Sequence, residues 1–146
     1  MAYINALSAY KETRIRTASQ GQLIVMLYDE AVKQLERGLE LINLNRSSKY
    51  EPSRIEIIGK AIIKARDIIT ELMVSLDFDQ GGEIAQNLFA LYTWFNKELL
   101  ESHITMDTGR IGTVKNQIAD LKTAWVDIAA KNNTEGRIIE GVNIAG

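Results

Sequence analysis

The single histidine is the first residue whose chemistry the sequence brings to attention. His103 follows Glu101 and Ser102, so a nucleophile, a base and an acid are neighbours in the chain. A catalytic relay needs these groups to converge in space, and adjacent residues of a helix point in different directions. The chain has no cysteine, which excludes thiol catalysis, zinc–thiolate sites and disulfides. We therefore expect a solvated or capping histidine, no cofactor and no enzymatic activity.

A group of acids and a pair of glycines suggest two kinds of ion site. Asp77, Asp79 and Glu83 resemble part of a calcium loop, but the twelfth position of an EF-hand loop starting at Asp77 is Leu88, which has no carboxylate. Gly81 and Gly82 precede a predicted helix, as in phosphate-binding loops, yet no lysine follows them. Turn formation and helix capping explain these residues better, and we predict no metal site.

The composition excludes further classes of protein. The chain has 146 residues, with 17 Lys and Arg against 19 Asp and Glu, which gives a net charge of -2. Binding to nucleic-acid phosphates needs a basic patch, so nucleic acid is not an expected partner. No apolar run reaches membrane-spanning length, and the N-terminus lacks the apolar core of a signal peptide. We expect a cytoplasmic protein that does not insert into membranes.

Apolar side chains outside the main helical stripes are the strongest candidates for a functional surface. Ile63 and Val74 are eleven residues apart, so they lie near one line along a helix, and Phe89 and Leu100 repeat that spacing on the next helix. Two such secondary stripes predict a groove that accepts another amphipathic helix. Together with further apolar residues outside the stripes and in the N-terminal segment, the predicted partner-binding residues are Leu7, Tyr10, Val25, Met26, Ile63, Val74, Phe89, Trp94 and Leu100.

The N-terminal segment has an apolar pattern of its own. Tyr3, Ile4, Leu7 and Tyr10 recur at helical spacing ahead of the polar residues 11–16. Two interpretations remain open: a short helix packed permanently on the rest of the protein, or a removable lid over a partner groove.

The elements that position these residues are predicted to be long helices. Pro52 is the only proline, and proline breaks helix interiors. The first two helices are predicted over residues 19–44 and 53–76, each starting with a capping-box pattern. The third is predicted to begin near Glu83, after a turn at residues 77–82, and the fourth near Asp107. The predicted inward residues of the first two helices are Leu23, Leu27, Ala31, Leu35, Ile42, Ile55, Ile58, Ile62, Ala65, Ile69, Leu72, Met73 and Leu76. Those of the last two helices are Ile84, Leu88, Leu91, Tyr92, Phe95, Leu99, Ile111, Val114, Ile118, Leu121, Trp125 and Ile128.

The expected architecture follows from the apolar stripes of these helices. Four amphipathic helices joined by short connections predict an all-α, antiparallel four-helix bundle with an additional short N-terminal helical segment. We divide the chain into an N-terminal segment at residues 1–18, a helical bundle at 19–131, and a tail at 132–146. The apolar period is lost in that tail and three glycines appear there, so we expect it to be mobile.

Two motifs resemble a known family. The first consists of Tyr10, then Thr17, Ala18 and Ser19, then LIVMLYD at residues 23–29. The second consists of Leu76 and Asp77, then GGEIAQNL at residues 81–88, then Leu91 and Tyr92, with Trp125 as a late match. Over roughly residues 10–130 the chain resembles the flagellin-specific export chaperones of the FliS family.

This resemblance implies a function as well as a fold. Proteins of the family bind the disordered C-terminal segment of flagellin in the bacterial cytosol, prevent its premature polymerisation, and escort it to the flagellar type III export apparatus. It also implies contact with the export-gate protein of that system. Two alternatives stay open from the residues alone. One is a histidine phosphotransfer module, although His103 lies near a helix end rather than mid-helix. The other is a structural bundle that self-associates through the same stripes.

Overall fold

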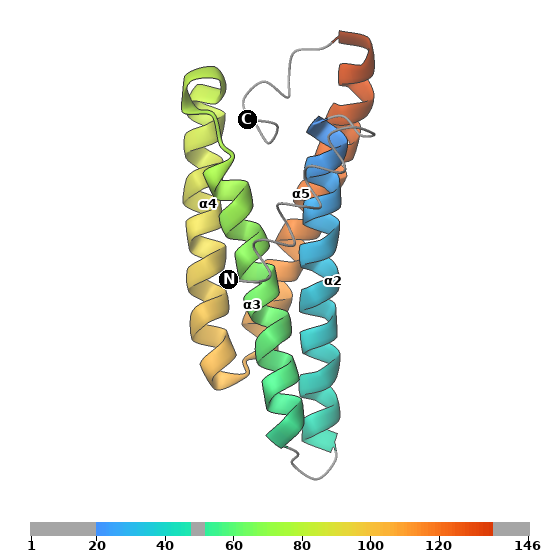
Figure 1. The fold of residues 1–146 in the computed structure, drawn as a ribbon, viewed down its shortest axis with the longest axis vertical. Coiled ribbons are helices and arrows are strands. Elements are labelled where there is room, and N and C mark those ends of the chain that lie inside the picture. The colour runs from blue at the N-terminus through green and yellow to red at the C-terminus, as the bar shows by residue number, and fades with distance from the viewer. Residues whose placement is uncertain (1–19, 48–51, 136–146) are drawn as a thin grey trace.

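The computed structural model describes residues 20–47 and 52–135, and all regular elements in these ranges are helices. They are α2 (Gln20–Ser47), α3 (Pro52–Val74), α4 (Phe78–Thr105) and α5 (Thr108–Glu135). Successive helices run in opposite directions along the long axis of the molecule (Figure 1). The predicted all-α antiparallel bundle is therefore confirmed. The predicted N-terminal helical segment lies outside the described residues.

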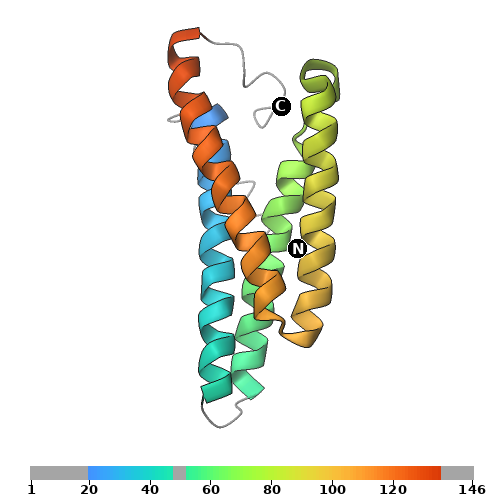
Figure 2. The ribbon, with the colours of Figure 1, turned by 180° about the vertical axis from the view of Figure 1, so that it is seen from behind.

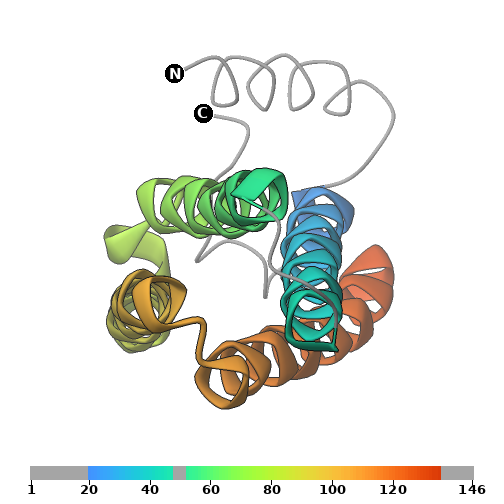
Figure 3. The same cartoon turned by 90° about the horizontal axis from the view of Figure 1, so that it is seen from below.

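The four helices form a closed circuit of contacts. Helix α2 packs on α3 and α5, and α4 packs on the same two helices, so α2 and α4 occupy opposite corners of the bundle (Figure 3). Helix α5 is tilted, and it crosses from the lower end of α4 towards the upper end of α2 (Figure 2). The upper ends of α4 and α5 consequently diverge, and the contacts of α4 are less extensive than those of α2.

The core consists of the predicted apolar stripes. On α3, for example, Ile58, Ile62, Ala65, Ile69 and Leu72 are all at most 1% exposed. Burying an aliphatic side chain of this size stabilises the fold by about 1.5–3 kcal/mol relative to its exposed state. The other buried members that the stripes predicted include Leu23, Leu27, Leu35, Leu88, Tyr92, Phe95, Leu99, Ile111, Val114, Ile118 and Trp125. Leu91, Leu121 and Ile128 are partly buried and pack against this core.

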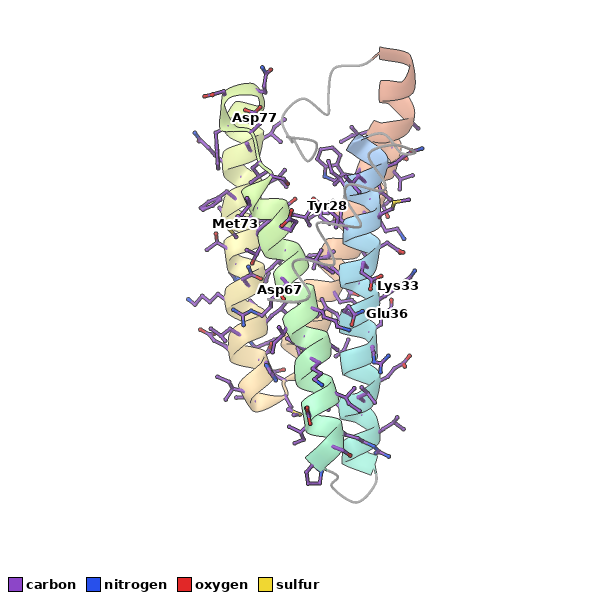
Figure 4. The ribbon with its side chains drawn as sticks, in the orientation of Figure 1. Tyr28, Lys33, Glu36, Asp67, Met73 and Asp77 are labelled. Atoms are coloured by element: carbon purple, nitrogen blue, oxygen red, sulfur yellow. The ribbon has the colours of Figure 1, made fainter. Side chains whose placement is uncertain are left out.

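Two buried tyrosines connect opposite corners of the bundle. The hydroxyl groups of Tyr28 on α2 and Tyr92 on α4 hydrogen bond to each other. Tyr28 points from α2 into the interior of the bundle (Figure 4). Burial raises the pKa of Tyr28 to about 12 and also raises the pKa of Tyr92. Both phenols are therefore neutral at physiological pH, and each serves as a hydrogen-bonding group within an apolar core.

The start of α4 differs from the prediction. The expected turn at residues 77–82 is instead the first turn of the helix, because Asp77 caps it by accepting hydrogen bonds from the N–H groups of Asp79 and Gln80 at 3.0 Å. Gly82 then interrupts the helix with φ 49° and ψ -122°, a conformation that favours glycine. The interruption redirects the first turn relative to the rest of α4. Ile84, predicted to point inward, is 65% exposed, because it lies near the start of α4, where α4 and α5 diverge.

Other helix ends differ from the prediction by a few residues. Helix α2 extends to Ser47, and α3 begins at Pro52, where proline suits the first helical position, and ends at Val74. Helix α5 continues to Glu135, so the predicted boundary between bundle and tail at residues 131 and 132 falls within a helix. The predicted segment 1–18 and residues 136–146 of the predicted tail lie outside the described residues.

The connection between α4 and α5 is fixed by a left-handed residue and an ion-pair cluster. Met106 ends α4 with φ 54° and ψ 43°. Arg110 on α5 reaches back to α4, where its Nε lies 3.1 Å from Glu98 Oε1 and its Nη2 lies 2.5 Å from Glu101 Oε2. The hydrogen bonds from Arg110 hold the pKa of Glu98 below its usual range. Because this cluster joins the helices only at their lower end, it leaves the upper ends free to diverge.

Candidate partner-binding surface

Two exposed apolar side chains of α3 and two of α4 lie along the outer line where these two helices meet. Ile63 and Val74 on α3 are 44% and 76% exposed, and Phe89 and Leu100 on α4 are 43% and 46% exposed. We call these four residues the outer seam. Their exposure agrees with the prediction that they lie off the core-facing stripes.

Two contacts fix how the helices are aligned along this seam. A Cβ atom at Gly59 of α3 would lie 3.2 Å from Nε2 of His103 on α4, and Asn96 Nδ2 of α4 donates a hydrogen bond of 3.1 Å to Thr70 Oγ1 of α3. Because the helices are antiparallel, this alignment puts Ile63 within about one helical turn of Leu100 and Val74 within about one turn of Phe89.

The seam therefore has two apolar ends and a polar centre. Its ends are separated by eleven residues, or about 16 Å along a helix. The hydrogen bond between Asn96 and Thr70 lies between them. His103 is half-buried in the same interface, where burial and the charge of Arg66 lower its pKa. An amphipathic helix of three to four turns would match the length of this surface.

Two further apolar residues extend the seam, and the sequence analysis missed both. Phe78, in the first turn of α4, contacts Phe89 edge-on with ring centroids 5.8 Å apart. An open hollow lined by residues 74–79 adjoins this pair. Ile104 is 78% exposed and follows Leu100 by one helical turn, a spacing that could have revealed it. Phe78 carried no such signal, because its position depends on the unexpected first turn of α4.

The remaining predicted partner-binding residues do not join the seam. Trp94 is 37% exposed, but its position on α4 is roughly 140° around the helix from Phe89. Its indole lies beside Phe95 on that other flank, with ring centroids 5.8 Å apart. Val25 and Met26 are half-buried on α2, which lies at the opposite corner from α4, and Val25 packs against the core. Leu7 and Tyr10 lie outside the described residues, as does the rest of the predicted lid.

The residues considered for catalysis and ion binding have structural roles. His103 is half-buried against Gly59, and the carboxylate of Asp77 caps α4 at the upper end of the bundle (Figure 4). Within residues 20–47 and 52–135, no group of three or more His, Asp or Glu side chains is arranged to hold a metal ion. In the same ranges, no helix is long and apolar enough to cross a membrane. The apolar seam is thus the feature of the described residues that best fits a function.

Comparison with known proteins gives one consistent family. The family model described as flagellar protein FliS matches residues 3–132. The flagellar secretion chaperone FliS of Salmonella typhimurium is 33% identical over 121 residues, which cover 82% of this chain and 84% of that protein. The proteins of the same name from Escherichia coli and Bacillus subtilis are 32% and 29% identical, over 78% and 86% of this chain and 79% and 86% of their own lengths.

Proposed function

Because the chain belongs to the FliS family of flagellar secretion chaperones, we propose that its client is flagellin and that the outer seam binds it. Membership of this family supports a chaperone rather than an enzyme, and it argues against the phosphotransfer module considered from the sequence. The observation that carries the proposal is the pairing of exposed apolar residues at both ends of the α3–α4 seam. The alternative of self-association through the same surface is an outcome that the experiment below separates.

The chemistry of the seam suits a disordered segment that becomes helical on binding. Residues such as Ile63 and Phe89 offer apolar area without a complete pocket, and one amphipathic helix can cover both ends of the seam. A segment that folds on binding loses conformational entropy at that moment, so it binds less tightly for its contact area and is released more readily. Reversible binding of this kind fits a chaperone that must surrender its client.

We propose that masking is the mechanism. The bound stretch is the C-terminal segment of flagellin, and its apolar face would lie against α3 and α4. That face is then unavailable for contacts with other flagellin molecules, which prevents premature polymerisation. The complex forms in the bacterial cytosol, and the next partner is the export-gate protein of the flagellar type III system. These assignments rest on the family and on the seam together.

The experiment compares intact flagellin with flagellin lacking its C-terminal segment. Calorimetric titration should give a one-to-one complex with the intact protein and no measurable heat of binding with the shortened one. Light scattering on the same samples should show the chain monomeric in the complex. Equal binding of both flagellins would refute the proposed client segment, and a stable dimer that persists unchanged with flagellin would favour self-association.

A further inference from the structure

The polar centre of the outer seam contains a cation that has no hydrogen-bonded partner among residues 20–47 and 52–135. Arg66 lies on α3 between Ile63 and Thr70, and no hydrogen bond or ion pair of its guanidinium is found within the described ranges. Its Nε is buried and without a hydrogen-bond partner. A buried polar group without a partner destabilises a protein by about 1–3 kcal/mol, and by more when it is charged. Such a group indicates either strain or a site for something that binds there.

An unused acceptor lies at the same level on the facing helix. Asn96 Oδ1 on α4 is also buried without a partner, whereas its Nδ2 donates to Thr70. The alignment set by Gly59 with His103 and by Thr70 with Asn96 brings Arg66 and Asn96 within about one turn of each other. The charge of Arg66 also lowers the pKa of His103, which places the guanidinium on the α4 side of α3. The centre of the seam therefore holds a cation whose charge acts on the neighbouring Asp67 but which, among the described residues, has no hydrogen-bonded anion.

Other cations that bridge helices in this bundle are paired. Arg110 bonds to Glu98 and Glu101, and Lys122 lies 2.7 Å from Asp29. The pairing of these residues holds helices together within the chain. Arg66 occupies a comparable position between helices, but the described part of α4 presents it with an amide and a histidine rather than a carboxylate. Since the described residues offer Arg66 no hydrogen-bonded carboxylate, a bound partner can supply one.

We propose that Arg66 binds a side-chain carboxylate of the client helix and thereby sets the position of that helix along the seam. This proposal rests on the proposed function and deepens it. Arg66 is three residues from Ile63 and eight from Val74, or about 5 Å and 12 Å along α3. The client segment should therefore carry an Asp or Glu about one turn from one apolar anchor and about two turns from the other.

The physical role of this contact is specificity. Apolar contacts at the two ends tolerate sliding of the bound helix, because neighbouring apolar residues can replace one another. A guanidinium–carboxylate pair is directional and two-pronged, so it is satisfied in one alignment and lost in the others. Misaligned or unrelated segments would cover Arg66 and leave it desolvated and unpaired, which disfavours them.

The first test measures coupling between Arg66 and the client. Arg66→Gln is titrated with full-length flagellin, with Lys60→Gln as the matched control, because Lys60 is an exposed α3 cation that pairs with Glu56. Loss of a charge-assisted pair should weaken binding by about tenfold or more, and the control should change it by less than about twofold.

Each Asp and Glu of the flagellin C-terminal segment is then replaced by its amide. One of these replacements should weaken binding to the unaltered chaperone and have no further effect on Arg66→Gln.

A second variant separates binding from a merely structural role. Asn96→Asp places a carboxylate within the chain at the level of Arg66, so it should raise the melting temperature and weaken flagellin binding. A raised melting temperature with unchanged affinity would overturn the proposal, and so would unchanged affinity of Arg66→Gln. Ile63→Asp separates a failure of the carboxylate site from a failure of the whole seam. If it abolishes binding while Arg66→Gln does not alter it, only the carboxylate site is wrong. If Ile63→Asp also binds normally, the seam itself is wrong.

Discussion

The hydrogen bond between Tyr28 and Tyr92 predicts a non-additive response to substitutions at its two ends. Replacing either tyrosine by phenylalanine removes one hydroxyl and leaves the ring in place. In each single variant, the remaining hydroxyl loses its partner within the apolar core.

The magnitudes follow from the number of hydroxyl groups left unpaired. A buried polar group without a partner costs about 1–3 kcal/mol, so each single variant should lower the free energy of unfolding by about that amount. In the double variant neither hydroxyl remains, so its loss should be smaller than the sum of the two single losses.

The assay is urea unfolding followed by circular dichroism of the unaltered chain, the two single variants and the double variant. The slope of the unfolding free energy against urea should stay constant, so that the midpoints report stability directly. Losses that add in the double variant would refute the assigned hydrogen bond between the two hydroxyls. A negligible loss in both single variants would show that neither hydroxyl depends on the other.

Four further substitutions test other parts of the structure. Phe95→Ala should cost about 3–5 kcal/mol, because this ring is fully buried. Phe89→Ala should cost less than about 1 kcal/mol, because Phe89 is 43% exposed, and similar losses in urea unfolding would show that the assignment of the α4 faces is wrong. The unfolded chain takes up a proton at His103 near pH 6.5, about the usual value for histidine, and the folded chain does so only at lower pH. Stability should consequently fall as the pH drops below about 6.5, and His103→Gln should make melting temperatures less dependent on pH in this range; an unchanged dependence would contradict the burial of His103. Gly82→Ala should cost about 1–3 kcal/mol through backbone strain alone, since its Cβ would meet no atom within 4 Å; undiminished thermal stability would mean that the interruption of α4 is absent in solution.

The core was predictable because it depends on a period that is visible in the chain. Residues such as Ile62, Phe95 and Ile118 recur at helical spacing, and each of them is buried. The stripes also identified the four residues of the outer seam. Each helix packs against only two others, so an apolar residue outside its core-facing stripe must face solvent or lie at the edge of a neighbouring helix. Helix number, order and antiparallel packing follow from the same pattern.

The remaining features depend on contacts between residues far apart in the chain. The first turn of α4 exists because Asp77 caps it and Gly82 absorbs the change in direction, and acids and glycines of this kind are equally typical of a turn. The sequence could not show that Arg66 has no hydrogen-bonded anion among the described residues, because neither its residue type nor its place in the helical pattern indicates this. It depends on which residue of α4 lies opposite, and therefore on the alignment of two helices. Trp94 was predicted to bind the partner because the pattern places it away from the core. The prediction did not take into account that it lies on the opposite side of α4 from Phe89.

The most direct test of the proposed client surface is a comparison of two charge substitutions at equally exposed apolar positions. Ile63 on α3 is 44% exposed and belongs to the outer seam, while Val126 on α5 is 45% exposed and does not. The affinity of Ile63→Asp and of Val126→Asp for full-length flagellin should be measured by calorimetry, with circular dichroism confirming that both variants are folded. We predict that Ile63→Asp binds at least about tenfold more weakly than the unaltered chain, because a carboxylate would be buried against the apolar client, and that Val126→Asp binds normally. Normal binding by Ile63→Asp, or an equal loss in both variants, would contradict the assignment of the α3–α4 seam as the flagellin-binding surface.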